Sequence, residues 1–264
     1  MMQKPMRCKF KPTFYIVFFF GFFFNAGSYS LTQADEIHAA VATNFLNPFN
    51  AVAKQFEKKT THDVIIISGS TGKLYAQIVN GAPFDIFLAA DELRPRLLLE
   101  QGKAVSGTQY SYAFGKITLW SPIPDVISKS LTLTLRKANF SHIAIANPVT
   151  APYGKAALQT LEKLNQWVHL KPRIVQGENI GQTFQFVFSK NAELGFVALS
   201  QVLDPKNIHK GKRLDIPSSY YDPIKQNLVV LTRGRDNAGT MDLWRFLKSN
   251  QAKTIIKGYG YELP

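Results

Sequence analysis

The strongest constraint on the fold is a regular alternation of short apolar runs and amphipathic segments over residues 35–101. Small and β-branched residues predict strands at 37–42, 64–67 and 86–89, the second of them fully buried. Each strand is followed by a segment with apolar residues three and four positions apart, which predicts helices around Phe49–Phe56, Leu74–Val79 and Glu92–Gln101. A β-α-β-α-β-α order predicts a parallel sheet with helices on both faces.

The same alternation restarts at residue 116. Strands are predicted at 117–120, 143–146, 173–175 and 194–198, and helices at 154–164 and after 181. A strand-like run at 224–232 precedes helices at 240–249 and around 254, which are expected to rejoin the first unit. The predicted fold is therefore α/β with two lobes, each a mixed, mostly parallel sheet flanked by helices. Lobe 1 is expected to comprise 35–115 and 226–264, and lobe 2 to comprise 116–225.

The first 34 residues have the features of a secretory signal peptide. Residues 1–11 contain four basic and no acidic residues, and an unbroken apolar run at 14–24 follows them. That run is shorter than the roughly 20 residues that a permanent membrane helix needs. Cleavage is predicted after Ala34, with Ala26–Ser28 as an earlier alternative and an uncleaved anchor as the competing interpretation. The mature protein is therefore expected in the periplasm.

The cysteine content and the distribution of charge exclude further classes of function. The only cysteine, Cys8, lies in the predicted leader, so the mature chain is expected to have no disulfide, thiolate metal site or cysteine nucleophile. The formal charge of +13 comes from basic residues that are scattered and not interleaved with aromatic residues. A secreted chain with this pattern is not expected to bind nucleic acid.

Four predicted strand-to-helix turns carry hydroxyls, amides or glycines. They are Ala42–Asn44, Gly69–Gly72, Ala151–Gly154 and Glu178–Gly181. Open α/β sheets bind ligands at the carboxyl ends of parallel strands. Helix starts also offer free N–H groups and the positive end of a dipole. Each turn alone has an ordinary structural interpretation as a helix cap. The four together predict a cage of donors for an anion.

The turns contain no Lys, Arg or His, since Lys73 and Lys155 follow them by one residue. Neutral donors suit an oxyanion without a proton, whereas hydrogen phosphate needs an acceptor for its own O–H. Sulfate, molybdate and tungstate are the expected candidates.

The residues at these turns resemble one family. Val41–Leu46, Ser68–Gly72, Tyr75–Asp85, Ala90–Glu92, Asn147–Pro148 with Ala151–Gly154, Leu194–Leu199 and the tail at 255–261 are similar to the periplasmic molybdate-binding proteins of ABC importers, the ModA family. The similarity extends in order over the whole predicted mature chain. It implies a type II periplasmic-binding fold, whose two lobes close on molybdate or tungstate.

The resemblance also implies a set of ligand residues. Thr43 and Asn44 correspond to the pair after the first strand. Thr71 is the best match for a hydroxyl in the second turn, with Ser70 as the alternative if the register differs by one. Tyr153 corresponds to the tyrosine of the third turn, and Ile180 contributes its backbone amide. Serine and valine are frequent in the family where this chain has Thr71 and Ile180.

The sequence thus predicts a monomeric receptor that captures molybdate or tungstate and delivers it to a membrane permease. No catalysis, no cofactor and no direct cation ligand are expected, since metal enters only as the oxyanion. A receptor for sulfate or another tetrahedral oxyanion is the first alternative. A secreted serine hydrolase using Ser68 or Ser70 is the second, but Ser68–Gly72 lacks the Gly-x-Ser-x-Gly pattern.

Overall fold

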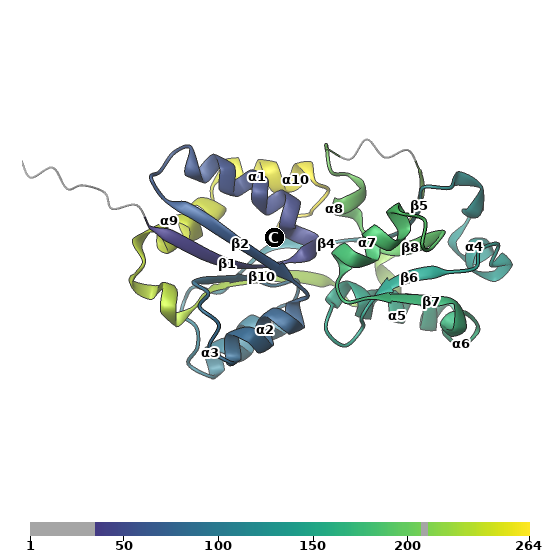
Figure 1. Ribbon diagram of the computed structural model, residues 1–264, viewed down its shortest axis with the longest axis horizontal. Coiled ribbons are helices and arrows are strands. Elements are labelled where there is room, and N and C mark those ends of the chain that lie inside the picture. The colour runs from purple at the N-terminus through teal and green to yellow at the C-terminus, as the bar shows by residue number, and fades with distance from the viewer. Residues whose placement is uncertain (1–34, 207–210) are drawn as a thin grey trace, which may run out of the picture. The chain divides into compact units, whose positions relative to one another are not determined.

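The computed structural model in Figure 1 describes residues 35–206 and 211–264, whose strands form two five-stranded sheets. The predicted signal peptide lies outside the described residues. Within the described ranges, no helix is long and apolar enough to cross a membrane.

The first sheet has the strand order β2-β1-β3-β10-β4. Its strands are β1 (Glu36–Ala42), β2 (Asp63–Gly69), β3 (Ile86–Leu88), β4 (Tyr110–Gly115) and β10 (Ile224–Val230). β1 pairs in parallel with both β2 and β3, whereas β10 pairs antiparallel with both β3 and β4. The parallel half matches the predicted alternation, because helical connections return the chain to the same end of the sheet.

Side chains of β1 alternate between two apolar clusters. Val41 belongs to a cluster with residues of α1 (Leu46–Glu57), α9 (Ala238–Leu247) and α10 (Asn250–Gly258). Ala40 belongs to a second cluster with residues of α2 (Thr71–Val79) and α3 (Leu93–Glu100). Figure 1 shows these two groups of helices on opposite faces of the sheet, which is the arrangement that the period of two in a strand requires.

The second sheet repeats this plan with the order β7-β6-β8-β5-β9. Its strands are β5 (Ile117–Ser121), β6 (Ile143–Ala146), β7 (Ile174–Gly177), β8 (Leu194–Ala198) and β9 (Lys212–Asp215). β6 pairs in parallel with β7 and β8, and β5 pairs antiparallel with β8 and β9. α5 (Pro152–Lys163) and α7 (Ile180–Phe188) pack into different clusters, one on each face.

Short elements complete the two lobes. The remaining α-helices are α4 (Leu131–Lys137), α6 (Trp167–Leu170) and α8 (Leu199–Val202). The 3-10 helices are η1 (Thr43–Phe45), η2 (Pro124–Val126), η3 (Lys171–Arg173), η4 (Ser218–Tyr220) and η5 (Thr232–Asp236).

The chain crosses between the sheets twice. It leaves the first sheet after Gly115 and returns at Ile224, and these two residues pair with each other in the β4–β10 ladder. A side chain at Gly115 would overlap the hydroxyl of Tyr153, which comes from the second lobe. The two crossings therefore lie side by side, in close contact with the start of α5.

Strand β2 departs from the prediction. Full burial was expected for residues 64–67, and this is wrong: β2 is an edge strand, and Ile65 is 42% exposed. Strand order decides burial here, because an edge position leaves apolar side chains less covered than a central one. Strands β4 and β9 were not predicted, and the short, polar Lys212–Asp215 has little strand pattern.

Candidate functional site

Four helical segments begin just beyond the carboxyl ends of parallel strands, two in each lobe. The η1–α1 segment follows β1, α2 follows β2, α5 follows β6 and α7 follows β7. One cavity is lined by residues from all four helix starts: Ala42, Thr43, Asn44, Gly69, Ser70, Thr71, Ala90, Ala151, Pro152, Tyr153, Asn179 and Ile180. All six residues that the sequence singled out are among them.

The cavity is small. Its free volume is about 10 Å³, close to the smallest space that holds one water molecule. A space of this size excludes a sugar or a peptide.

Two hydroxyl groups at the cavity have no hydrogen-bond partner. The Oγ1 of Thr43 and the Oγ of Ser70 are both buried and unpaired. Leaving a buried polar atom unpaired costs about 1–3 kcal/mol, so such atoms are rare in folded proteins. Both residues line the same cavity, and both belong to the first lobe. These two hydroxyls are therefore available to a ligand that accepts hydrogen bonds.

The surroundings of α2 explain why Ser70 is free. Ser70 is the N-cap of this helix and has extended backbone angles, yet its side chain caps no N–H. The N–H of Gly72 instead donates to the carbonyl of Thr150 in the second lobe, at 2.8 Å. The neighbouring Thr71 also lines the cavity, and its Oγ1 accepts from the N–H of Ala90 at 3.0 Å, which leaves its own O–H to donate. The hydroxyls of Ser70 and Thr71, between which the sequence left the choice open, can therefore both donate to a ligand.

Asn44 lines the cavity with its side chain turned elsewhere. Its Nδ2 donates to Oε1 of Gln226 at 2.8 Å and to Oη of Tyr261 at 3.0 Å. A primary amide has two N–H donors, so both are used. The backbone N–H groups of Thr43 and Asn44 lie in the first turn of the helical segment, where no acceptor within the helix is available. Asn44 therefore offers its main chain to the cavity.

The second lobe also contributes main-chain groups. The N–H of Tyr153 lies in the first turn of α5, and that of Ile180 is the first in α7. Oδ1 of Asn179 accepts from the next two amides of α7, those of Gly181 and Gln182, at 2.9 and 3.0 Å. This cap leaves the N–H of Ile180 free, at the positive end of the helix.

The hydroxyl of Tyr153 points away from these amides and toward the crossings. It accepts from Nε2 of Gln226 at 3.2 Å. Burial raises the pKa of this hydroxyl well above its ordinary value, so it stays protonated at neutral pH. The expectation that Tyr153 serves the site is thus better supported for its backbone N–H than for its side chain.

No charged side chain lines the cavity. The two nearest lysines in sequence are exposed and paired: Lys73 with Glu178, and Lys155 with Asp222 at 2.8 Å. Among residues 35–206 and 211–264, no group of three or more His, Cys, Asp or Glu side chains is arranged to hold a metal ion. The donors at the cavity are therefore neutral hydroxyls and amides.

Several contacts join the lobes around the cavity. Besides the bond from Gly72 to Thr150, Nη2 of Arg94 donates to the carbonyl of Val149 at 3.2 Å. The ion pair between Lys73 and Glu178 also links α2 to the loop before α7. The lobes are therefore closed over the site.

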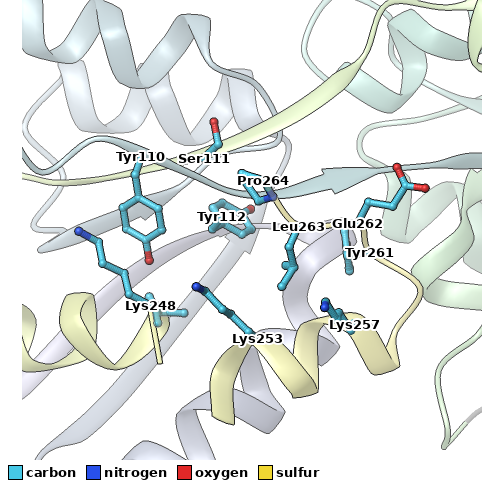
Figure 2. A pocket seen from close by; sticks show the side chains of 11 residues that line it. Tyr110, Ser111, Tyr112, Lys248, Lys253, Lys257, Tyr261, Glu262, Leu263 and Pro264 are labelled. Atoms are coloured by element: carbon cyan, nitrogen blue, oxygen red, sulfur yellow. The ribbon is translucent and has the colours of Figure 1, made fainter. Parts of the chain in front are cut away.

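A larger cavity of about 810 Å³ lies elsewhere (Figure 2). Its walls come only from the first lobe, from β4, the end of α9, α10 and the C-terminal tail. Figure 2 shows Lys248 beside Tyr110, and Lys253 and Lys257 rising from α10. A ligand there would not touch the second lobe, so this cavity lacks the geometry of a site between two lobes.

A two-lobed α/β fold with a small, closed, donor-lined cavity between the lobes defines a solute-binding protein. The family model for bacterial extracellular solute-binding proteins matches residues 37–262, and the chain belongs to this family. It is therefore a binding protein of an extracytoplasmic transport system and not an enzyme, and the predicted fold class is confirmed.

Two relatives and one solved structure are especially similar. The molybdate-binding protein ModA of Azotobacter vinelandii is 47% identical over 88% of this chain and 91% of its own length. ModA of Rhodobacter capsulatus is 42% identical over 86% of this chain and 88% of its own. The structure of the A. vinelandii periplasmic molybdate-binding protein superposes with a TM-score of 0.83 at 40% identity, covering 86% of this chain and 99% of that one.

Proposed function

We propose that this protein captures molybdate or tungstate in the periplasm and delivers it to the permease of an ABC importer. The names of the two relatives with more than 40% identity support this ligand class. The cavity between the lobes supports it independently, because both lobes line it with neutral donors, which suit an oxyanion without a proton.

The observation that carries the proposal is the pair of unpartnered hydroxyls, Thr43 and Ser70, beside free amides of both lobes. A tetrahedral dianion accepts hydrogen bonds at every oxygen, so it satisfies hydroxyls and amides together. Hydrogen phosphate also carries an O–H, and no carboxylate lines the cavity to accept that proton. The site is therefore suited to molybdate, tungstate or sulfate in preference to phosphate.

Ligand capture proceeds by closure of the lobes. Thr43, Asn44 and Ser70 belong to one lobe, and the amides of Tyr153 and Ile180 belong to the other. An anion that bonds to both lobes stabilises the closed conformation relative to the open one. The permease then recognises the closed, loaded form.

The division into lobes at 35–115 with 226–264 and at 116–225 forms part of the proposal. So do removal of a signal peptide that ends near Ala34, a monomeric state and the lack of a nucleic-acid partner. Mass spectrometry of the exported protein gives the mature N-terminus, and analytical ultracentrifugation gives the oligomeric state.

Isothermal titration calorimetry with molybdate, tungstate, sulfate and phosphate tests the proposed function. Tight binding of molybdate and tungstate, and weaker or undetectable binding of phosphate, is the expected result. A receptor for sulfate is the competing outcome, and it would show sulfate bound more tightly than the two larger anions. Absence of binding by molybdate and tungstate contradicts the proposal.

The hydrolase alternative has less support. None of the four histidines in the described part of the chain lines the cavity, so neither Ser68 nor Ser70 has an imidazole base there.

A further inference from the structure

Behind the ligand cavity lies a buried cluster of polar side chains that joins the two lobes. Its centre is the hydroxyl of Tyr261. This residue lies in the C-terminal tail of the first lobe and is 5% exposed. Its Oη lies 2.9 Å from the carbonyl of Asn44 and accepts from the side-chain Nδ2 of the same residue at 3.0 Å. Tyr261 thus holds both the main chain and the side chain of a cavity residue.

The second lobe reaches the same point through Ser200 in α8, directly after β8. The Oγ of Ser200 lies 3.0 Å from the carbonyl of Asn44 and 3.0 Å from Oη of Tyr261. Because a tyrosine hydroxyl has one proton, Oη of Tyr261 donates either to this carbonyl or to Oγ of Ser200, and in the second case the serine hydroxyl donates to the carbonyl. Asn44, Ser200 and Tyr261 therefore form a triangle of hydrogen bonds that spans both lobes. The triangle exists only while Ser200 stays beside the Thr43–Asn44 segment.

Tyr261 does not line the ligand cavity. It lines the larger cavity of the first lobe, where Figure 2 shows it beside Glu262. Any effect of Tyr261 on ligand binding must therefore pass through the residues that its hydroxyl contacts, which are Asn44, Ser200 and the hydroxyl of Tyr153.

We propose that Tyr261 is a positioning residue, which sets the amides of Thr43 and Asn44 toward the ligand and locks them to the second lobe through Ser200 when the lobes close. This inference rests on the proposed function, since it assigns a role in capture of the same anion. In the open form the contact with Ser200 is lost, and the carbonyl of Asn44 keeps only Tyr261 as a side-chain donor. The triangle thus favours the closed state and slows release of the ligand.

The test compares the kinetics of anion binding in Tyr261→Phe, Ser200→Ala and the double variant. It uses whichever of molybdate, tungstate and sulfate the wild-type protein binds most tightly. Stopped-flow fluorescence gives the association and dissociation rate constants. The matched control is Tyr259→Phe, because Tyr259 is buried in the same tail and its hydroxyl makes no side-chain hydrogen bond in the described ranges.

Tyr261→Phe should raise the dissociation rate constant about tenfold and change the association rate constant less than twofold, as expected for one or two lost buried hydrogen bonds. Ser200→Ala should act in the same direction by a smaller factor. Because the two residues share one cluster, the dissociation rate constant of the double variant should rise by less than the product of the two single-variant factors. The ratio of molybdate to sulfate affinity should stay at the wild-type value, since no ligand contact changes.

A merely structural role predicts a different result. Tyr261→Phe would then lower the denaturant midpoint of the ligand-free protein, while its dissociation rate constant would match that of Tyr259→Phe. That outcome overturns the inference and leaves the proposed function intact. So does a dissociation rate constant in the double variant that rises by the full product of the two single-variant factors. Should Tyr261→Phe fail to fold, Ser200→Ala decides the question by the same comparison of rate constants. Wild-type protein that binds none of the three anions overturns the proposed function and this inference together.

Discussion

The two lobes serve one cavity with different chemistry. The first lobe presents side-chain hydroxyls without partners, those of Thr43 and Ser70. In the second lobe the two polar side chains that line the cavity, those of Tyr153 and Asn179, already make hydrogen bonds. Oδ1 of Asn179 caps α7, and the hydroxyl of Tyr153 bonds to Gln226. The second lobe therefore contributes through its backbone amides.

Because of this difference, substitutions in the two lobes should affect ligand binding in different ways. Side-chain substitutions in the first lobe should remove ligand contacts directly. Side-chain substitutions in the second lobe should act through helix caps or through the approach of the two lobes, because a side-chain change leaves the backbone amide in place.

The largest effect is expected from removing the free hydroxyls. Thr43→Ala and Ser70→Ala should each weaken molybdate binding by roughly 1.5–3 kcal/mol, the value of a hydrogen bond to a charged group. Folding stability should change little, because neither hydroxyl has a partner in the ligand-free protein. Calorimetry measures the affinity, with the exposed Thr254→Ala and Ser189→Ala as controls. Wild-type affinity in both variants would remove these hydroxyls from the site.

A substitution that keeps the two lobes apart should weaken molybdate binding as much as the loss of one hydroxyl, or slightly less. A methyl group at Gly181 would overlap Cγ2 of Thr43 where the two lobes touch beside the cavity, so Gly181→Ala should weaken binding by about 1–3 kcal/mol. Thr43→Ser removes that methyl and keeps the hydroxyl, so the double variant should regain affinity.

Gly258→Ala is the matched control for Gly181→Ala, because a side chain at position 258 would meet nothing within 4 Å. Failure of Thr43→Ser to rescue Gly181→Ala would show that the steric argument is wrong.

Loss of the cap of α7 should act on both stability and binding. Asn179→Ala should lower the free energy of unfolding by about 1 kcal/mol, with a modest loss of affinity, because the amides beside Ile180 lose their acceptor. Asn237 caps α9 in the same way through the N–H of Thr240, away from the cavity. Asn237→Ala should therefore lower stability and leave affinity unchanged. Equal affinity losses in the two variants would contradict the distinction.

Tyr153→Phe should weaken binding less than Ser70→Ala does. The substitution removes an acceptor for Gln226 and retains the backbone N–H of residue 153 at the cavity. The expected loss in the free energy of ligand binding is about 0.5–1.5 kcal/mol. Calorimetry on both variants gives the order directly. A larger loss for Tyr153→Phe would place the tyrosine hydroxyl on the ligand and reverse the assignment.

The smallest expected effect is on the pH dependence of folding stability. Burial raises the pKa of Tyr112, Tyr153 and Tyr261 above 10, so the folded protein retains protons that the unfolded chain releases. The contribution of these hydroxyls to stability should be constant below about pH 10 and should fall as the pH rises further. Urea denaturation from pH 8 to 11 measures this. The triple Phe variant should lose part of that dependence, because burial also raises the pKa of Tyr110, Tyr221 and Tyr259, and an unchanged slope in it would exclude the three replaced tyrosines as a cause.

The sequence predicted the turns at the site because caps and strand ends are local features. Parallel strands then bring their carboxyl ends together, which placed all six residues around one cavity. The orientation of the Asn44 side chain was beyond such reasoning, because its partners Gln226 and Tyr261 lie about two hundred residues away. The hydrogen bonds around Ser70 and Thr71 likewise depend on distant backbone groups, those of Ala90 and Thr150.

A crystal structure of the protein with molybdate tests the central claim most directly. The ligand oxygens should lie within hydrogen-bond distance of the hydroxyls of Thr43 and Ser70 and of the amides of Tyr153 and Ile180, with no charged side chain in contact. Molybdate bound to lysine or arginine side chains, or held by one lobe alone, would contradict it.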